Sequence, residues 1–266
     1  MPTRKGISVH PLCCRTVGTS VESSGRTTAA FFDLDKTIIS KSSTLAFAPS
    51  FYRLGLISRT KAVRGAWAQV AFRLTGASHS RMERVRDQVS DLCRGWDAER
   101  IAQIVTDNLA SVIKPHVYAE ARDLVAHHLS EGHDVLIVST SGQEIVGPIG
   151  AMLGACAVIA TRLEVADGHY TGAMEFYAYG QAKADRVREL AAQRGYRLAD
   201  CFAYSDSVTD LPLLELVGRP RVVNPDRALR KVARSRDWPV LSFSSFCQTP
   251  TYALSSQETD QTAPGM

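Results

Sequence analysis

The sequence has no run of about 18 apolar residues, the length that a membrane-spanning helix requires. It has only six cysteines, and none forms a C-x-x-C pair or a cluster with histidine, which excludes the common zinc-binding patterns. Aromatic residues make up 8% of the 266 residues, and the net charge of +4 is too small to indicate a nucleic-acid partner. We therefore expect an ordinary globular protein, of one large or two smaller domains, in the reducing cytoplasm.

Both ends of the chain lack the pattern of a folded domain. Residues 1–27 contain no apolar stretch like that of a signal peptide, and they combine four basic residues with a single acid among Ser, Thr and Gly. Residues 248–266 are polar as well. We expect a flexible N-terminal tail at 1–27 and a disordered C-terminal tail at 248–266.

Between these tails, short apolar segments alternate with helical patterns. Five segments are predicted to be strands: Thr28–Phe32, Asp134–Val138, Cys156–Ala160, Asp200–Tyr204 and Arg221–Val223. Four helices are predicted between them: Tyr118–Ser130, Gln143–Leu153, Lys183–Gln193 and Leu211–Val217. An Asp-Gly pair predicts a β-hairpin over Thr161–Phe176. The alternation indicates an α/β fold, a Rossmann-like parallel sheet with helices on both faces, formed by residues 28–40 and 116–247.

Residues 41–115 interrupt this alternation and are too many for a structureless loop. Apolar residues recur at helical spacing in three segments: Lys61–Leu74, Ser80–Cys93 and Ala98–Ile113, the last with Asp97 as a candidate N-cap. We expect a helical cap, inserted after the first strand and lying above the strand ends. The cap holds twelve Lys and Arg and six Asp and Glu, so its net charge of +6 exceeds that of the whole chain. A basic lid over an acidic sheet edge fits a phosphate ester better than a nucleic acid.

Polar side chains follow three of the predicted strands: Asp33 the first, Ser139 the second and Asp206 the fourth. Ligands bind at the carboxyl ends of parallel strands, so this pattern predicts a site. The spacing of Asp33 and Asp35 lets the Asp33 carboxylate and the Asp35 carbonyl face one cation, while the Asp35 carboxylate stays free for proton transfer. Oxygen ligands of this kind suit Mg²⁺, and a carboxylate can attack phosphorus to form an aspartyl-phosphate.

Each candidate residue also has an ordinary structural alternative. Ser139 could cap a helix, Lys183 could be a solvated helix residue, Asp206 could be another cap and Asp210 a surface acid. Their order along the chain, each after the expected strand or hairpin, favours a shared site.

Four segments resemble the motifs of a known family: AFFDLDKTII, VLIVSTS, GQAKADRVREL and AYSDSVTDLPLLE. They look like motifs I to IV of the haloacid dehalogenase-like phosphohydrolases, and the helical insertion matches the C1 cap position of that family. The hairpin segment ATRLEVADGHYTGAM also resembles the phosphoserine phosphatase-like subgroup, subfamily IB. The resemblance covers about Thr28–Phe243.

The resemblance implies a chemical role for the four acids. Asp33 would be the nucleophile, and Asp35 would be the general acid that protonates the leaving oxygen and then the base that activates water. Asp33, the Asp35 carbonyl and Asp206 would hold Mg²⁺, and Asp210 would order the metal-bound water and the lysine.

The resemblance also implies a set of substrate contacts. Ser139 and Lys183 would hold the phosphoryl oxygens, Thr37 would orient the loop, and Thr140 completes the predicted set. Phosphoserine phosphatases carry a glutamate seven residues after the general acid, where it reads the substrate amino group. Ser42 stands at that position here, and a hydroxyl does not replace the charge.

These patterns favour a cytoplasmic, Mg²⁺-dependent phosphomonoesterase that acts on a small phosphorylated metabolite. Two alternatives stay open at this point. The protein could be regulatory, binding or dephosphorylating a phosphorylated partner in a process such as growth or differentiation. It could also act on phospholipid head groups, because the Lys61–Leu74 helix combines a broad apolar face with a basic one and so could contact a membrane surface.

Overall fold

The computed structural model describes residues 8–9, 27–56, 87 and 90–247. Its strands are β1 (Ser8–Val9), β2 (Ala29–Phe32), β3 (Asp134–Gly142), β4 (Ala157–Ala166), β5 (His169–Phe176), β6 (Phe202–Ser205), β7 (Arg219–Val223) and β8 (Val240–Leu241). Its helices are α1 (Ser43–Ala46), α2 (Ala48–Arg53), α5 (Ala98–Val112), α6 (Ala119–Ser130), α7 (Gln143–Met152), α8 (Gln181–Arg194), α9 (Leu211–Leu216) and α10 (Arg227–Ser235). Short 3-10 turns lie at Lys114–His116, Leu198–Asp200 and Val208–Asp210.

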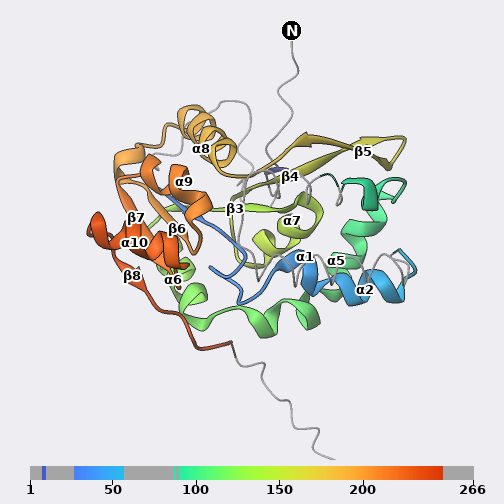
Figure 1. Cartoon of the computed structure of the whole chain (residues 1–266), viewed down its shortest axis with the longest axis horizontal. Helices are drawn as coiled ribbons and strands as arrows, with labels where there is room; N and C mark the ends of the chain where they lie inside the picture. Colours follow the sequence, from blue (N-terminus) through green and yellow to red (C-terminus); the bar gives the residue numbers. More distant parts are fainter. Residues whose placement is uncertain (1–7, 10–26, 57–86, 88–89, 248–266) are drawn as a thin grey trace, which may run out of the picture.

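The strands form one sheet in the order β1-β4-β3-β2-β6-β7-β8, and β5 pairs with β4 off this path. Five parallel pairings join the six strands β4, β3, β2, β6, β7 and β8, whereas β1 and β5 run antiparallel to β4. Helices α8, α9 and α10 gather on one side of Figure 1, and α1, α2 and α5, which belong to the predicted cap, lie on the other. The central position of β2 places the residue after it, Asp33, in the middle of the sheet edge.

Both faces of the sheet are buried, which explains why its strands read as apolar runs. On β2, Ala30 and Phe32 belong to one hydrophobic cluster, while Ala29 and Phe31 belong to another on the opposite face. The first cluster is completed by apolar side chains of α5, α6 and α7, and the second by those of α8, α9 and α10. The predicted α/β fold with helices on both faces is therefore confirmed.

Differences from the predicted elements concern the strand ends and the shortest strands. Strand β4 does not stop at Ala160 but continues to Ala166, so the hairpin is an extension of the sheet strand itself. The two-residue strands β1 and β8 were not predicted, because two residues carry no periodicity. Strand β1 lies within the segment expected to be a flexible tail, and Ser8 and Val9 pair with Val158 and Ala157 of β4.

Residues 41–115, the predicted cap, include α5 and the chain before it, which pairs with the hairpin. Helix α5 begins after Asp97, whose carboxylate accepts a hydrogen bond from the Arg100 amide at 3.0 Å, so the predicted N-cap is confirmed. Next to it, the hairpin pairs with the chain before α5, since the Gly95 amide donates to the Tyr170 carbonyl at 2.8 Å. Figure 1 shows the hairpin reaching from the sheet toward this part of the cap.

Several predictions fall on residues outside the described part of the chain. These are the Lys61–Leu74 helix, most of the Ser80–Cys93 helix, the C-terminal tail and all of the N-terminal tail except Ser8, Val9 and Thr27. Of the second helix, residues 90–93 are described and are helical. Within the described ranges, no helix is both long enough and apolar enough to cross a bilayer.

Gly218, between α9 and β7, gives a test of how tightly the sheet domain is packed. A Cβ atom at this position would lie 1.8 Å from the Ala199 carbonyl oxygen, and the Gly218 amide donates to the Leu198 carbonyl at 2.9 Å. Because the clash is with backbone, we expect Gly218→Ala to lower the free energy of unfolding by about 3 kcal/mol or more in urea titrations. Gly147→Ala in α7 is the control, since a Cβ there meets nothing within 4 Å. A Gly218→Ala protein as stable as this control would contradict the packing.

Candidate active site

Three strand ends bring the predicted site residues to one edge of the sheet. Asp33 follows β2, Ser139 lies in β3, which pairs with β2 on one side, and Asp206 follows β6, which pairs with β2 on the other. The Asp33 amide donates to the Tyr204 carbonyl at 2.9 Å, which continues the β2–β6 ladder by one residue. The nucleophile candidate is therefore held by sheet hydrogen bonds rather than by a loose loop.

Lys183 is buried between two of the acids. Its Nζ donates to Asp33 Oδ1 at 2.8 Å and to Asp210 Oδ2 at 3.0 Å, and its side chain is 2% exposed. The Ser205 hydroxyl donates to Asp210 Oδ2 at 2.8 Å. Lys183 is thus not a solvated helix residue and Asp210 is not a surface acid, so both structural alternatives are wrong.

The charges of this cluster do not balance. Burial raises the pKa of Asp33 well above its ordinary value; Lys183 opposes this rise, and the nearby Asp210 and Asp206 add to it. Burial would lower the pKa of Lys183, but Asp210 and Asp33 outweigh burial and raise it. The single positive charge of Lys183 therefore does not neutralise all of the buried carboxylates around it. An added cation would stabilise the ionised form of these acids.

Asp206 shows the same excess of negative charge. It is buried, and burial raises its pKa to about 7, with Asp210 and Asp226 adding to the rise and Lys36 opposing it. Its loop is tied to α10, because the Asp226 amide donates to the Asp206 carbonyl at 2.8 Å and the Val208 amide donates to Asp226 Oδ2 at 2.9 Å.

The donor set of this edge fits a hard divalent cation. No group of three His, Cys, Asp or Glu side chains in the described part of the chain converges as a metal cage. The predicted ligand set does not need one, because it combines two carboxylates, Asp33 and Asp206, with the Asp35 carbonyl. Burial raises the pKa of both carboxylates, and neighbouring acids raise each pKa further. The edge therefore offers oxygen ligands with an excess of negative charge, which a hard divalent cation would balance.

Asp35 is held apart from this charged cluster. The Ser43 amide donates to its Oδ1 at 2.9 Å, and the Ser141 hydroxyl donates to its Oδ2 at 3.0 Å. Burial raises the pKa of Asp35, although the hydrogen bonds from Ser43 and Ser141 and the charge of Lys183 act in the opposite direction. A carboxyl group with a raised pKa holds its proton more tightly than a solvated one, which suits a group that donates a proton.

The remaining predicted residues, Thr37, Ser139 and Thr140, differ in the partners that their hydroxyl groups contact. The Thr37 hydroxyl donates to Asp33 Oδ2 at 3.4 Å, and Ser139 is 1% exposed, with its Oγ accepting from the Ser141 amide at 3.2 Å. Ser139 is not a helix cap, because the N-cap of α7 is Gly142. The Thr140 hydroxyl donates to the Ala178 carbonyl at 2.9 Å, so its proton is used within the protein.

Sequence reasoning missed the hydroxyl groups around the acids. Ser43 and Ser141 bind Asp35, and Ser205 binds Asp210, yet none of them was a candidate. The signal for Ser205 and Ser141 was their place at the ends of the two strands that flank β2. Ser42 stands at the position where phosphoserine phosphatases carry a glutamate. It is the N-cap residue of α1 and makes no side-chain capping bond.

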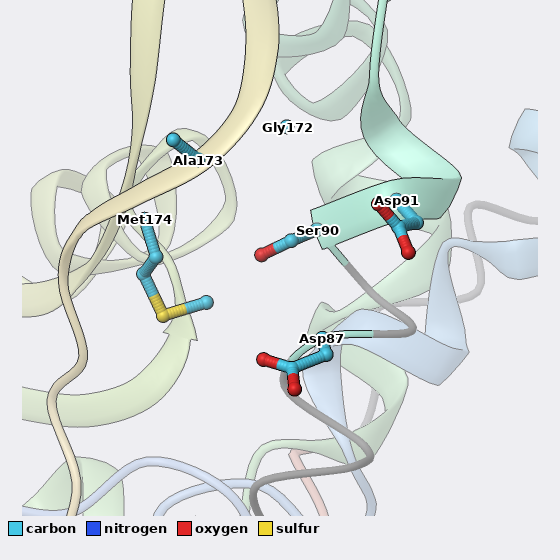
Figure 2. A pocket seen from close by; sticks show the side chains of 6 residues that line it. All are labelled: Asp87, Ser90, Asp91, Gly172, Ala173 and Met174. Carbon is cyan, nitrogen blue, oxygen red and sulfur yellow. The ribbon is translucent and has the colours of Figure 1, made fainter.

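A separate hollow lies between the cap and β5 (Figure 2). It is lined by Asp87, Ser90, Asp91, Gly172, Ala173 and Met174. The side chains of Asp87, Ser90 and Met174 point into the same space in this view. The residues that line it include none of the predicted site residues, so the chemistry of the strand ends is elsewhere.

A parallel α/β sheet with an aspartate after its central strand, a buried lysine and two acids after the next strand defines a class of hydrolase. Residues 30–215 match the model of the haloacid dehalogenase-like hydrolases, and this stretch contains every predicted site residue. The chain belongs to this family, so the resemblance of its four motifs is confirmed.

Named relatives support the assignment. A protein of Streptomyces azureus named "Inhibition of morphological differentiation protein" is 56% identical over 217 residues, which cover 81% of this chain and 78% of that protein. A "Probable phosphatase" of Mycobacterium tuberculosis (strain ATCC 25618 / H37Rv) is 55% identical over 217 residues, 82% of this chain and 76% of that protein. The crystal structure of a protein of unknown function from Bordetella pertussis Tohama I aligns with a TM-score of 0.72 and 30% identity, covering 81% of this chain and 98% of the other.

Proposed function

We propose that this hydrolase is a Mg²⁺-dependent phosphomonoesterase that forms an aspartyl-phosphate on Asp33. The observation that carries the proposal is the contact of Lys183 with Asp33 at 2.8 Å and with Asp210 at 3.0 Å, at the end of the central strand. A carboxylate aimed at a buried cation is suited to attack a phosphoryl group whose charge the same cation stabilises. The 55% identical relative named as a probable phosphatase agrees with this chemistry.

The reaction proceeds in two steps. Asp33 attacks phosphorus, the bond to the ester oxygen breaks, and Asp35 gives its proton to that oxygen. Asp35 then takes a proton from water as the water attacks the phospho-aspartate, and the carboxylate of Asp33 is restored. Lys183 and Ser139 contact the phosphoryl oxygens, and Thr37 keeps Asp33 oriented. Of the predicted substrate contacts, Thr140 has its hydroxyl proton committed to Ala178, which leaves it a role in shaping the loop.

A magnesium ion would be held by the carboxylates of Asp33 and Asp206 and by the Asp35 carbonyl, with Asp210 ordering its water and Lys183. When bound, Mg²⁺ neutralises charge on the transferring phosphoryl group. We expect phosphate release to be lost in excess EDTA and restored by Mg²⁺, because buried acids with raised pKa values need a counter-charge to stay ionised. Full activity in EDTA would contradict the metal requirement.

The substrate proposed is a small phosphorylated metabolite, and the enzyme is placed in the cytoplasm. The test is a panel of phosphorylated metabolites with Mg²⁺, scored by released inorganic phosphate, with the Asp33→Asn protein as the blank. Phosphoserine is the discriminating member, because Ser42 supplies no negative charge for its amino group. We expect phosphoserine to show no preference over esters that lack an amino group, and phosphate release from no ester at all would overturn the proposal.

A regulatory role is a second candidate, favoured by the name of the 56% identical relative, which refers to inhibition of morphological differentiation. In this case the protein would bind a phosphorylated partner, and hydrolysis would be secondary. A cellular phenotype of the deletion strain that is rescued equally by wild-type and Asp33→Asn proteins supports this candidate. Rescue by the wild-type protein alone assigns the phenotype to the enzyme.

A further inference from the structure

Both oxygens of the Asp35 carboxylate are held by neighbours that the reaction itself does not use. The Ser43 amide is 2.9 Å from Oδ1, and the Ser141 hydroxyl is 3.0 Å from Oδ2. Ser43 is fully buried and Ser141 is 9% exposed. With a hydrogen bond on each oxygen, the plane of the carboxyl group is set by two fixed points.

Ser141 is the centre of a small hydroxyl cluster. Its Oγ lies 3.0 Å from Asp35 Oδ2, 2.9 Å from Ser43 Oγ and 3.1 Å from Thr44 Oγ1. An ionised carboxylate only accepts hydrogen bonds, so the single proton of Ser141 goes to Asp35, and Ser43 and Thr44 donate to Ser141. Ser141 then has one donor bond and two acceptor bonds, which leaves its hydroxyl a single orientation.

The backbone around Ser141 explains how this side chain reaches Asp35. Along β3, Ser139 pairs with Ala160 of β4, but the next paired residue is Gly142, which pairs with Thr161. Thr140 and Ser141 are therefore extra residues in a bulge of β3. Bulges redirect side chains and are frequent next to active sites.

The cluster also joins two parts of the molecule. Ser141 belongs to β3 of the sheet domain, while Ser43 and Thr44 open α1, the first helix of the cap segment. Asp35 is thus held by one group from the sheet and one from the cap.

We propose that Ser141, supported by Ser43 and Thr44, is a positioning residue that orients the Asp35 carboxyl group toward the leaving oxygen of the substrate. The inference rests on the proposed phosphomonoesterase function and goes beyond it. It also names the class of ester that depends on the cluster. Esters of alcohols and of weakly acidic phenols, whose leaving oxygen needs a proton as the phosphorus–oxygen bond breaks, depend on this orientation. Esters of acidic phenols, whose anions leave unprotonated, do not.

The test compares two esters of similar shape, phenyl phosphate and p-nitrophenyl phosphate, with Mg²⁺ present. In Ser141→Ala we expect kcat/KM for phenyl phosphate to fall about tenfold or more, and kcat/KM for p-nitrophenyl phosphate to fall less than about threefold. We compare kcat/KM because this ratio includes only the steps up to the departure of the first product, the phenol. Hydrolysis of the phospho-aspartate, which is common to both esters, does not enter it.

Three further variants separate positioning from a general structural effect. Ser141→Thr keeps the hydroxyl and should restore the phenyl phosphate rate, and Thr44→Val removes one donor to Ser141 and should give a smaller loss with the same ester preference. Ser130→Ala, which removes an exposed hydroxyl bonded to the His127 carbonyl of α6, should change neither rate. Thermal unfolding of each protein shows whether it is folded.

The outcomes separate failure of the inference from failure of the proposed function. Equal losses on the two esters in Ser141→Ala, or no loss on phenyl phosphate, would overturn the positioning role and leave the phosphatase proposal standing. A wild-type protein that releases phosphate from neither ester with Mg²⁺, nor from the metabolite panel, would overturn the proposed function itself.

Discussion

Asp33→Asn is expected to lower phosphate release by about 10⁴-fold or more while the protein stays folded, because an amide does not form the phospho-enzyme. Asn has the shape of Asp and can still accept a hydrogen bond from Lys183 through its side-chain oxygen. The reaction should therefore stop at the chemical step rather than at substrate binding. Initial rates of phosphate release, measured on the best ester of the panel, check this expectation.

The stability of the Asp33→Asn protein gives a second measurement. Burial and the neighbouring acids raise the pKa of Asp33, so its ionised form is disfavoured in the folded state. In EDTA at neutral pH, we expect the urea midpoint of the variant to equal or exceed that of the wild-type protein. Asp167→Asn, a change at an exposed hairpin turn, is the matched control. Retention of Mg²⁺-dependent activity in Asp33→Asn would refute the nucleophile assignment.

Lys183→Met is expected to affect both activity and stability. The substitution leaves Asp33 and Asp210 buried without their shared cation, and loss of one partner of a buried ion pair costs about 3–5 kcal/mol. The phosphoryl group also loses a positive contact, so kcat should fall about 10²-fold or more. Urea unfolding and phosphate release measure the two effects, and Lys231→Met on exposed α10 is the control.

The pH dependence of the Lys183→Met protein tests the cause of its instability. Burial already raises the pKa of Asp33 in the folded state and Lys183 opposes this rise, so without the lysine the folded state binds more protons than the unfolded chain between the two pKa values of Asp33. Stability should then rise as the pH falls from 7 toward 5, relative to the wild-type protein. The double variant with Asp210→Asn should regain part of the stability at pH 7 but none of the activity. A pH-independent loss would mean that the lysine acts by packing alone.

The places of the four acids in the fold could be predicted from the sequence because they follow from topology. An acid that directly follows a buried parallel strand must lie at the carboxyl edge of the sheet, and Asp33 and Asp206 follow neighbouring strands. The place of Lys183 does not follow from topology alone, because only the order of the motifs distinguishes it from a solvated helix residue. The structure resolves that ambiguity through its burial.

The hydroxyl groups could not be found in the same way. Ser141 reaches Asp35 because β3 carries a bulge, and the sequence STSG has no pattern that announces extra residues in a strand. Thr140 was predicted to contact the substrate, but the same bulge gives its hydroxyl to Ala178. Strands β1 and β8 are set by pairing with distant partners rather than by local preference.

The central place of β2 in the sheet also affects how the protein becomes active during synthesis. Among the strands in parallel pairings this one is made first, yet the Ala29 amide meets Cys201 Sγ 172 residues later, and Asp33 meets Lys183 150 residues later. Contacts of such separation form late in folding. The proposed nucleophile, Asp33, is therefore made long before the groups that contact it, and a partly made chain contains this aspartate without Lys183 beside it. If Asp33 and Lys183 act together as proposed, catalytic activity requires that the whole sheet has formed, because no local segment contains both residues.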